Sequence, residues 1–396
     1  MQQQQNILNP KSKRKFLMQS INLVVACAIG ACATIADAQT QPRDTWRHSC
    51  YAFKDMNRNG IFDMGDKPYA NLPVEMTRPD GTKTRQRSNI DGFANFEASL
   101  GDDSADVFEP GHHNVRAIFD EGWQSLSKTA TQNLIFIEKV NAGGRIVPEK
   151  PCMPIGVVPI LEIKGKITPV SNFATTAYSV VAIDKRDQTR LDLLVDENGN
   201  FLGIGRQGEW RLEVRNPDGV LVHARDFVIE HGAVYFSNIV PGETTKPEAD
   251  VVWHELTFDD FLVSDSLFEI PSGYGGLNSY NLIAVHNRFY EGGGYVNGTV
   301  SSEYIAYNSS GVPVPIWADD PFDFKGTYVS VAWSRGKEED VIFRAWREGK
   351  IVHEDKLRLT NSGPIYFDAN YENITKMEIS HGNYERIVLD NFHYKF

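Results

Sequence analysis

Short runs of alternating apolar and polar residues fill most of the chain after residue 50. Examples are Leu72–Met76, Ser179–Ile183, Trp210–Val214 and Tyr328–Trp333, with Asn-Gly, Asp-Gly and Gly-Asp pairs between such runs. A period of two turns one face of a strand to a core and the other to solvent. Windows with apolar residues at i, i+3, i+4 and i+7 are missing after the N-terminal segment. The pattern therefore predicts an all-β protein built of tandem β-sandwiches.

Two proline-rich stretches, Pro148–Pro154 and Pro241–Pro247, interrupt this pattern. Proline stiffens a connecting segment and suits a boundary between folded units. We therefore expect three modules, at residues 46–155, 156–243 and 248–396.

The N-terminus has the order of features typical of a secretory signal peptide. Basic residues at positions 11 to 15 precede a mostly apolar stretch, Phe16–Ile35, and Ala36-Asp37-Ala38 is a small-x-small cleavage site. This predicts a signal peptide over residues 1–38. A second interpretation stays open, because Ile29-Gly30-Ala31-Cys32 is similar to a bacterial lipobox, which would attach lipid to Cys32. An uncleaved anchor helix is the third, and all three place the remaining chain outside the cytoplasm, secreted or on the outer surface.

Export leaves two cysteines in the predicted modules, Cys50 and Cys152. We expect them just before the first strand and just after the last strand of the first module. In an oxidising compartment they are expected to form a disulfide. It would close a loop of about 100 residues, for which the chain-entropy estimate is at most about 4.7 kcal/mol. The alternative is two buried free thiols.

Residues 55–66 match a twelve-residue calcium loop. Oxygen ligands fall at positions 1, 3, 5, 9 and 12, the carbonyl of Ile61 falls at position 7, and Gly60 is at position 6, where the chain must turn sharply. The side-chain ligands are Asp55, Asn57, Asn59, Asp63 and Asp66. A bare loop without flanking helices predicts weak Ca²⁺ binding, with a dissociation constant of about 10⁻⁴–10⁻³ M. The alternative is a turn without an ion.

The first module resembles a known family. The run Tyr51–Gly60, followed by Asp63 and Gly65-Asp66, is similar to the start of the B-repeat (SD-repeat B-like) domains of serine-aspartate-repeat surface adhesins. The resemblance covers about 100 residues. It implies a calcium-rigidified, prealbumin-like or Ig-like β-sandwich that serves as a stalk or spacer rather than as an enzyme.

The middle module carries less information. Residues 196–201 and 208–214 resemble hairpins of a carboxypeptidase-regulatory-like, or transthyretin-like, sandwich. Asp196, Asn198 and Asn200 are expected to form a solvated turn, because no further acidic ligands follow at loop spacing.

The third module opens with Phe258-Asp259-Asp260-Phe261 and closes with Val388–Phe392. With the aromatic and glycine-rich motifs between them, these segments resemble a bacterial jelly-roll module likened to carbohydrate-binding modules. In such folds the first and last strands lie close. The resemblance thus brings Asp259 or Asp260 near Asp390, a candidate second calcium site. The alternative is a set of exposed acids at two strand ends.

Sugar-binding faces combine flat aromatic rings with amides, because pyranose C–H faces pack on rings and hydroxyls need directed hydrogen bonds. The third module is rich in both kinds of side chain. Its candidates are Tyr274, Asn278, Tyr280, Tyr290, Tyr295 and Trp317. For each of them a place in the core is the alternative.

The net charge and the absence of catalytic motifs argue against two classes of function, nucleic-acid binding and common types of enzyme. With 40 Lys and Arg against 52 Asp and Glu, the net charge of −12 disfavours binding to nucleic acid. No zinc spacing or Gly-x-Ser-x-Gly elbow occurs, and Glu291–Gly294 is expected to precede a strand rather than a phosphate-binding helix.

We therefore expect a non-catalytic, exported protein that binds an extracellular glycan or surface ligand through its third module. Its contact with a membrane would come only from a lipid on Cys32. The alternatives are a purely structural matrix or appendage component, and a carbohydrate-active enzyme with an unrecognised pair of carboxylates.

Overall fold

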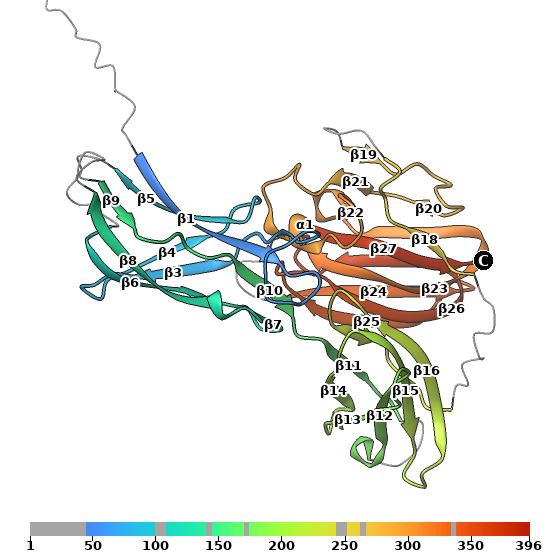
Figure 1. The fold of residues 1–396 in the computed structure, drawn as a ribbon. Helices are drawn as coiled ribbons and strands as arrows, with labels where there is room; N and C mark the ends of the chain where they lie inside the picture. The colour runs from blue at the N-terminus through green and yellow to red at the C-terminus, as the bar shows by residue number, and fades with distance from the viewer. Residues whose placement is uncertain are drawn as a thin grey trace, which may run out of the picture. The chain divides into compact units, whose positions relative to one another are not determined.

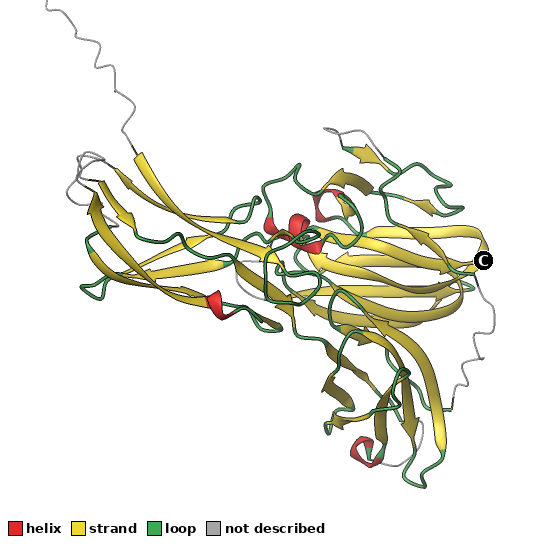
Figure 2. Cartoon of the chain, in the orientation of Figure 1, coloured by secondary structure: helices red, strands yellow, loops and turns green. Residues whose placement is uncertain are grey.

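The structure is a computed structural model that describes residues 45–99, 108–139, 145–169, 174–242, 252–261, 267–333 and 338–396. Strands make up most of its regular structure, as Figures 1 and 2 show, so the all-β prediction is confirmed. The four runs singled out by their alternation all lie in strands or within two residues of one. The predicted signal peptide and Cys32 lie outside the described residues.

The first module is a sandwich of two five-stranded sheets. One sheet has the order β2-β1-β10-β7 with β5 also paired to β1, and the other has the order β4-β3-β6-β8-β9. Buried residues of both sheets, Ala52, Phe96 and Phe136 among them, form one core. The strands are β1 (Thr45–Lys54), β2 (Lys67–Pro68), β3 (Pro73–Thr77), β4 (Lys83–Arg87), β5 (Phe93–Ser99), β6 (Gly111–Ala117), β7 (Trp123–Gln124), β8 (Thr131–Lys139), β9 (Arg145–Pro148) and β10 (Ile155–Pro159), with the 3₁₀ helix η1 (Lys128–Ala130) before β8.

Strand β10 corrects the expected end of this module. It pairs in parallel with β1, with Ala52 opposite Ile155, so the predicted boundary at residues 155/156 falls on the strand and the sheet extends to Pro159. The proline-rich stretch is followed by a return to the sheet, because Ile155 and Val157 complete its core. Cys50 consequently lies within the first strand rather than before it, and Cys152 lies just before the last strand rather than after it.

The middle module has its own core, in which Phe201, Leu212 and Phe236 are buried. Strands β13, β12, β15 and β16 pair antiparallel in that order, while β13 also pairs with β14, and β14, β11 and β17 continue the pairing. The elements are β11 (Glu162–Lys166), η3 (Thr175–Ala177), β12 (Ser179–Asp184), β13 (Arg190–Val195), β14 (Asn200–Ile204), β15 (Gly208–Arg215), β16 (Leu221–Ile229) and β17 (Val234–Phe236). Asp196 accepts N–H groups of Asn198 and Asn200 in an exposed turn, as expected.

The third module is centred on two long strands, β23 and β26, and β23 also pairs with β27. The first strand, β18, pairs antiparallel with the last, β27, as the jelly-roll resemblance implies. The strands are β18 (His254–Leu256), β19 (Phe268–Glu269), β20 (Asn278–Ser279), β21 (Leu282–His286), β22 (Tyr304–Asn308), β23 (Val314–Val331), β24 (Glu339–Arg347), β25 (Lys350–Leu359), β26 (Ile365–His381) and β27 (Ile387–Lys395), with η4 (Ser309–Gly311) after β22.

The glycine run at residues 292–294 opens a helix, α1 (Gly293–Gly298), where a strand was expected. Close packing explains the glycines. A β-carbon on Gly292 would lie 2.5 Å from Nε1 of Trp333, and one on Gly294 would lie 2.0 Å from the carbonyl oxygen of Val331. The glycines therefore allow α1 to pack directly against the end of β23 and against Trp333.

The middle and third modules share a sheet. Strand β17 pairs in parallel with β26, with Val234 opposite Tyr366 and Phe236 opposite Asp368. Ser237 adds a hydrogen bond of 2.6 Å to the carbonyl of Ala369. Residues 44–396 form one compact unit, so the modules are joined more closely than a row of separate spacers.

Candidate cation loop and ligand face

The loop predicted to bind calcium connects β1 to β2. Asp55 is buried at the end of β1, and its carboxylate accepts the N–H groups of Asn59 at 3.0 Å and Gly60 at 2.8 Å. Asp66 closes the loop by accepting a backbone N–H at the loop's start, 2.9 Å away, and that of Asp63, 3.0 Å away. Gly60 has a φ of +76°, in the left-handed region that glycine adopts without strain.

The amide ligand positions join the same network. Asn57 and Asn59 donate side-chain N–H groups to Asp63 at 3.0 Å and 2.7 Å, and Ile61 donates its backbone N–H to the Asn59 side chain at 2.7 Å. The structure thus brings all six predicted ligand residues into one loop network.

The charges of this loop are not paired within the chain. In the described residues, no Lys, Arg or His nitrogen lies within 4.0 Å of the Asp55, Asp63 or Asp66 carboxylates. These carboxylates do not all come within 4.8 Å of one another, and backbone and amide N–H groups occupy them instead. Three carboxylates and two amide oxygens form a donor set that suits Ca²⁺. Its coordination would require the side chains to turn from those N–H groups toward the ion.

Two of the three acids of the candidate second site bind the same segment, and the third does not. Asp390 is fully buried and accepts the N–H groups of Val300 at 2.7 Å and Ser301 at 2.9 Å. Asp259 accepts the N–H groups of Glu303 and Tyr304, three residues further along the same segment. Asp260 lies apart and accepts the hydroxyl of Tyr274. Burial raises the pKa of Asp390 to about 6, against the opposing effect of its hydrogen bonds.

Two lysines of the first module reach this acidic pair. Lys67 donates to the carbonyls of Ser301 at 2.7 Å and Ser302 at 3.1 Å, and buried Lys54 donates to the carbonyl of Thr299 at 2.9 Å. Burial lowers the pKa of Lys54 to about 7, with a further decrease from the charge of Lys67. Burial also lowers the pKa of Lys67, while the charges of Asp390 and Asp259 oppose that decrease. Positive charge from the chain itself therefore lies where a second cation was expected.

The six candidate ligand-binding residues fall into two groups, one near β20 and one around α1, and Figure 1 shows β20 and α1 at different ends of the third module. Asn278 lies opposite Trp317 in the β20–β23 pair, and Tyr280 nearby is 63% exposed. Tyr274 packs on Phe261, with ring centroids 5.0 Å apart. The second group, Tyr290 and Tyr295, lies around α1.

Around α1, four rings form a cluster that we call the aromatic nest: Tyr290, Tyr295, Tyr307 and Trp333. The guanidinium of Arg386 lies over three of them, with its central carbon 4.6 Å from the ring centre of Tyr290, 5.1 Å from that of Trp333 and 5.3 Å from that of Tyr307. Tyr295 and Tyr307 are buried beneath, whereas Trp333 is 37% exposed at the surface. The nest is thus open on one side and holds a cation.

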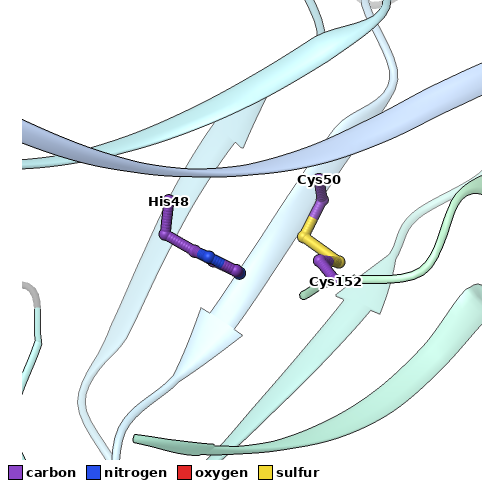
Figure 3. A group of neighbouring side chains, drawn as sticks. All are labelled: His48, Cys50 and Cys152. Atoms are coloured by element: carbon purple, nitrogen blue, oxygen red, sulfur yellow. A yellow bond between two sulfur atoms is a disulfide. The ribbon is translucent and has the colours of Figure 1, made fainter. Parts of the chain in front are cut away.

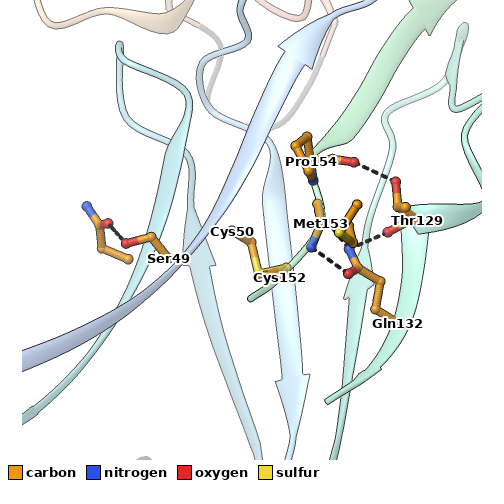
Figure 4. The surroundings of a disulfide bond; sticks show 8 residues. Ser49, Cys50, Thr129, Gln132, Cys152, Met153 and Pro154 are labelled. Atoms are coloured by element: carbon orange, nitrogen blue, oxygen red, sulfur yellow. Dashed lines mark hydrogen bonds between the residues drawn. A yellow bond between two sulfur atoms is a disulfide. The ribbon is translucent and has the colours of Figure 1, made fainter. Parts of the chain in front are cut away.

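Cys50 and Cys152 form the predicted disulfide, with Cα atoms 5.2 Å apart. His48 lies beside it (Figure 3), but sulfurs bonded to each other offer no thiolate to a metal. Burial, and then the charge of His113, lower the pKa of His48 to about 4. After Cys152, the side chain of Gln132 binds both backbone groups of Met153, at 2.8 Å and 2.9 Å (Figure 4).

A cleft of about 200 Å³ lies where residues of all three modules meet. Trp123 and Gly122 come from the first module, Lys164 from the second and Arg358 from the third. Charged side chains at this cleft pair with neighbours, as Lys164 does with Glu162 at 2.9 Å. The cleft is therefore a junction between modules whose basic side chains already form ion pairs with acidic residues of the chain.

Within the described residues, none of the helices has the length and apolar character needed to cross a bilayer.

No family model matches the sequence, and no curated protein matches it. Among solved structures, the Bacillus anthracis TIE protein aligns with 89% of this chain and 45% of its own, at 10% identity and a TM-score of 0.23. BcpA, the major pilin subunit of Bacillus cereus, aligns with 83% of this chain and 100% of its own, at 8% identity and a TM-score of 0.21. A structure of CBM51-2 in complex with GlcNAc and INT domains from Clostridium perfringens ZmpB aligns with 59% of this chain and 48% of its own, at 13% identity and a TM-score of 0.24. The chain thus spans less than half of the TIE structure.

Sequence reasoning missed five residues of these sites: Lys54, Lys67, Tyr307, Trp333 and Arg386. Lys54 directly precedes the calcium loop, and Trp333 ends a run assigned to a strand. Nothing in the local sequence shows that Lys67 reaches another module or that Arg386 lies over rings more than fifty residues away. The sequence signal that could have found them is an aromatic or cationic residue at a strand end, which is too common to be specific.

Proposed function

We propose that this protein is a non-catalytic, exported binding protein that recognises an extracellular glycan through the aromatic nest of its third module. The observation that carries the proposal is the open side of the nest, where Trp333 is exposed beside half-buried Tyr290 and 41% exposed Phe289. Exposed, rigidly packed rings at one place on a protein are typical of a binding site rather than of a core.

The nest has the mechanical properties that sugar recognition requires. Tyr290 is held from below by a 3.0 Å hydrogen bond between its hydroxyl and that of Tyr307, and by packing on Tyr295 with centroids 5.2 Å apart. Trp333 packs edge-on against Tyr295 at 5.3 Å. Because these rings are fixed before a ligand arrives, binding would order few side chains and lose little entropy.

Three buried carboxylates with structural partners support a non-catalytic protein. Asp184 pairs with Arg186 at 2.8 Å and Arg206 at 2.7 Å, and Asp355 accepts the Tyr371 hydroxyl at 2.7 Å. Asp390 is engaged by backbone N–H groups. Each has a structural partner, which is the role expected of a buried charge outside an active site.

We also propose that Ca²⁺ binds in the loop of residues 55–66. The support is the register of Asp55, Asn57, Asn59, Asp63 and Asp66 and the lack of an ion pair to its carboxylates in the described residues. Calcium would then stiffen the turn between β1 and β2, and β1 carries Lys54 to the third module.

A glycan array probed with a chain that begins at Gln39 tests the binding function. Trp333→Ala should reduce binding to any positive glycan by about tenfold, the loss of one stacked ring. Trp317→Ala, at the other end of the module, is the matched control and should leave binding unchanged. If no glycan binds, or if only Trp317→Ala reduces binding, the proposed site is wrong.

A further inference from the structure

Arg386 is an unusual cation for an acidic protein. In the described residues, no carboxylate oxygen lies within 4.0 Å of its guanidinium, although other arginines of this module, such as Arg344 and Arg358, have such partners. Its one side-chain hydrogen bond in these residues is donated by Nη1 to the hydroxyl of Tyr295, at 3.2 Å. Most of its N–H donors are therefore available to another acceptor.

The rings fix the position of this guanidinium. The ring centres of Tyr290, Trp333 and Tyr307 lie 4.6–5.3 Å from its central carbon, so cation–π attraction holds it in place. Its backbone is also fixed, because its carbonyl accepts the N–H of Ala332 at 2.8 Å, next to Trp333. A planar fork of donors is thus held rigid before any ligand binds.

The chemistry of this fork selects the ligand. A guanidinium matches a carboxylate through two parallel hydrogen bonds, and a charge-assisted pair is stronger than a neutral one. The exposed ring of Trp333 lies beside it and can pack on the C–H face of a pyranose. A sugar residue that carries a carboxylate, as uronic and sialic acids do, would satisfy both groups at once.

We propose that the open side of the aromatic nest binds a carboxylated sugar, with Arg386 holding the carboxylate and Trp333 packing on the ring. This inference rests on the proposed glycan function and names the class of glycan. The acidic surface of the protein would repel such ligands elsewhere, so binding would be confined to this local positive site.

The test uses pairs of glycans that differ only in the carboxyl group. Titration calorimetry would compare sialyllactose with lactose, and oligogalacturonate with its carboxyl-reduced form, for a chain that begins at Gln39. The acidic member of at least one pair should bind about tenfold or more tightly than its neutral partner. Arg386→Gln should remove that difference, and Arg386→Lys should restore only part of it, because an ammonium keeps the charge but lacks the fork.

Lys376→Gln is the matched control, since Lys376 also lies over a ring of this module, 4.9 Å from that of Trp346. It should leave the difference unchanged.

Equal binding of acidic and neutral glycans, together with a loss of binding in Trp333→Ala, would overturn the carboxylate assignment and leave the glycan function intact. Binding of sulfated but not carboxylated sugars would also overturn it. Binding of acidic peptides with no glycan binding would overturn both proposals, and unchanged melting temperatures of the variants would show that folding is not the cause.

Discussion

Two acidic regions of this molecule differ in whether the chain itself brings positive charge to them. Around Asp390 and Asp259, the ammonium groups of Lys54 and Lys67 arrive from the first module and bind carbonyls of the same segment. In the loop of residues 55–66, three carboxylates lie close in sequence, and no cation of the described residues pairs with them. The difference teaches that an acidic motif is a candidate for a metal ion only where the fold brings no cation of its own.

The largest expected effect comes from the region with the internal cations. Asp390→Ala should lower the free energy of unfolding by about 3–5 kcal/mol, because several buried donors lose their acceptor at about 1–3 kcal/mol each. Chemical denaturation measures it, and the loss should be the same with calcium and with chelator. Asp259→Ala, at a half-exposed position, is the control and should cost less. A loss that calcium reverses would mean that this region does hold an ion.

The loop should behave in the opposite way. Calcium at about 100 times its dissociation constant should stabilise the chain by about 2.7 kcal/mol, and Asp55→Ala should remove most of that gain. Thermal unfolding in calcium and in chelator measures it. Asp196→Ala, in the turn of the middle module that was not expected to bind an ion, is the control and should keep the response. Identical melting of the unsubstituted chain in both buffers would leave the loop a plain turn.

A smaller effect concerns pH and the buried amine of Lys54. Its pKa is lowered to about 7 in the folded chain, so above that pH the unfolded chain binds more protons than the folded one. The free energy of unfolding should therefore rise with pH from about 7 toward the normal lysine value, by about 1 kcal/mol between pH 7 and pH 8. Lys54→Met should flatten this rise relative to the unsubstituted chain. An equal rise in both would show that Lys54 is not its source.

The smallest expected effect comes from a substitution that removes one internal cation, so that the region around Asp390 and Asp259 resembles the acidic loop. Lys67→Ala removes an ammonium from the carbonyls of Ser301 and Ser302 and leaves Asp259 and Asp390 without it. Calcium at about twice the dissociation constant of the new site should then stabilise an Asp55→Ala, Lys67→Ala double variant by about 0.6 kcal/mol more than it stabilises Asp55→Ala alone. No response in the double variant would mean that these acids and carbonyls cannot form an ion site.

Local patterns in the sequence were sufficient for the strands, the position of the acidic loop and the disulfide partners. Alternation identified strands such as β3, β12 and β15 because a period of two depends only on neighbouring residues. The six predicted positions of the loop lie within twelve consecutive residues, so their hydrogen-bond network forms within the loop itself. The disulfide followed from the predicted export and from the two cysteines in the predicted modules.

Features that depend on how distant segments pair were beyond such patterns. Strand β10 returned to the first sheet past a proline-rich stretch, and the glycine run became α1 because it packs on β23 and Trp333. Both outcomes depend on a partner more than thirty residues away, which local propensity does not encode.

The sequence by itself determined the fold class, the strand runs and the acidic loop, because each is written in residues a few positions apart. Only the tertiary structure decided that Lys54 and Lys67 bind carbonyls of another module, and that Tyr290, Tyr307, Trp333 and Arg386 form one cluster. The physical reason is that strand pairing sets which side chains meet. A shift of one residue in the register turns every side chain of a strand to the opposite face.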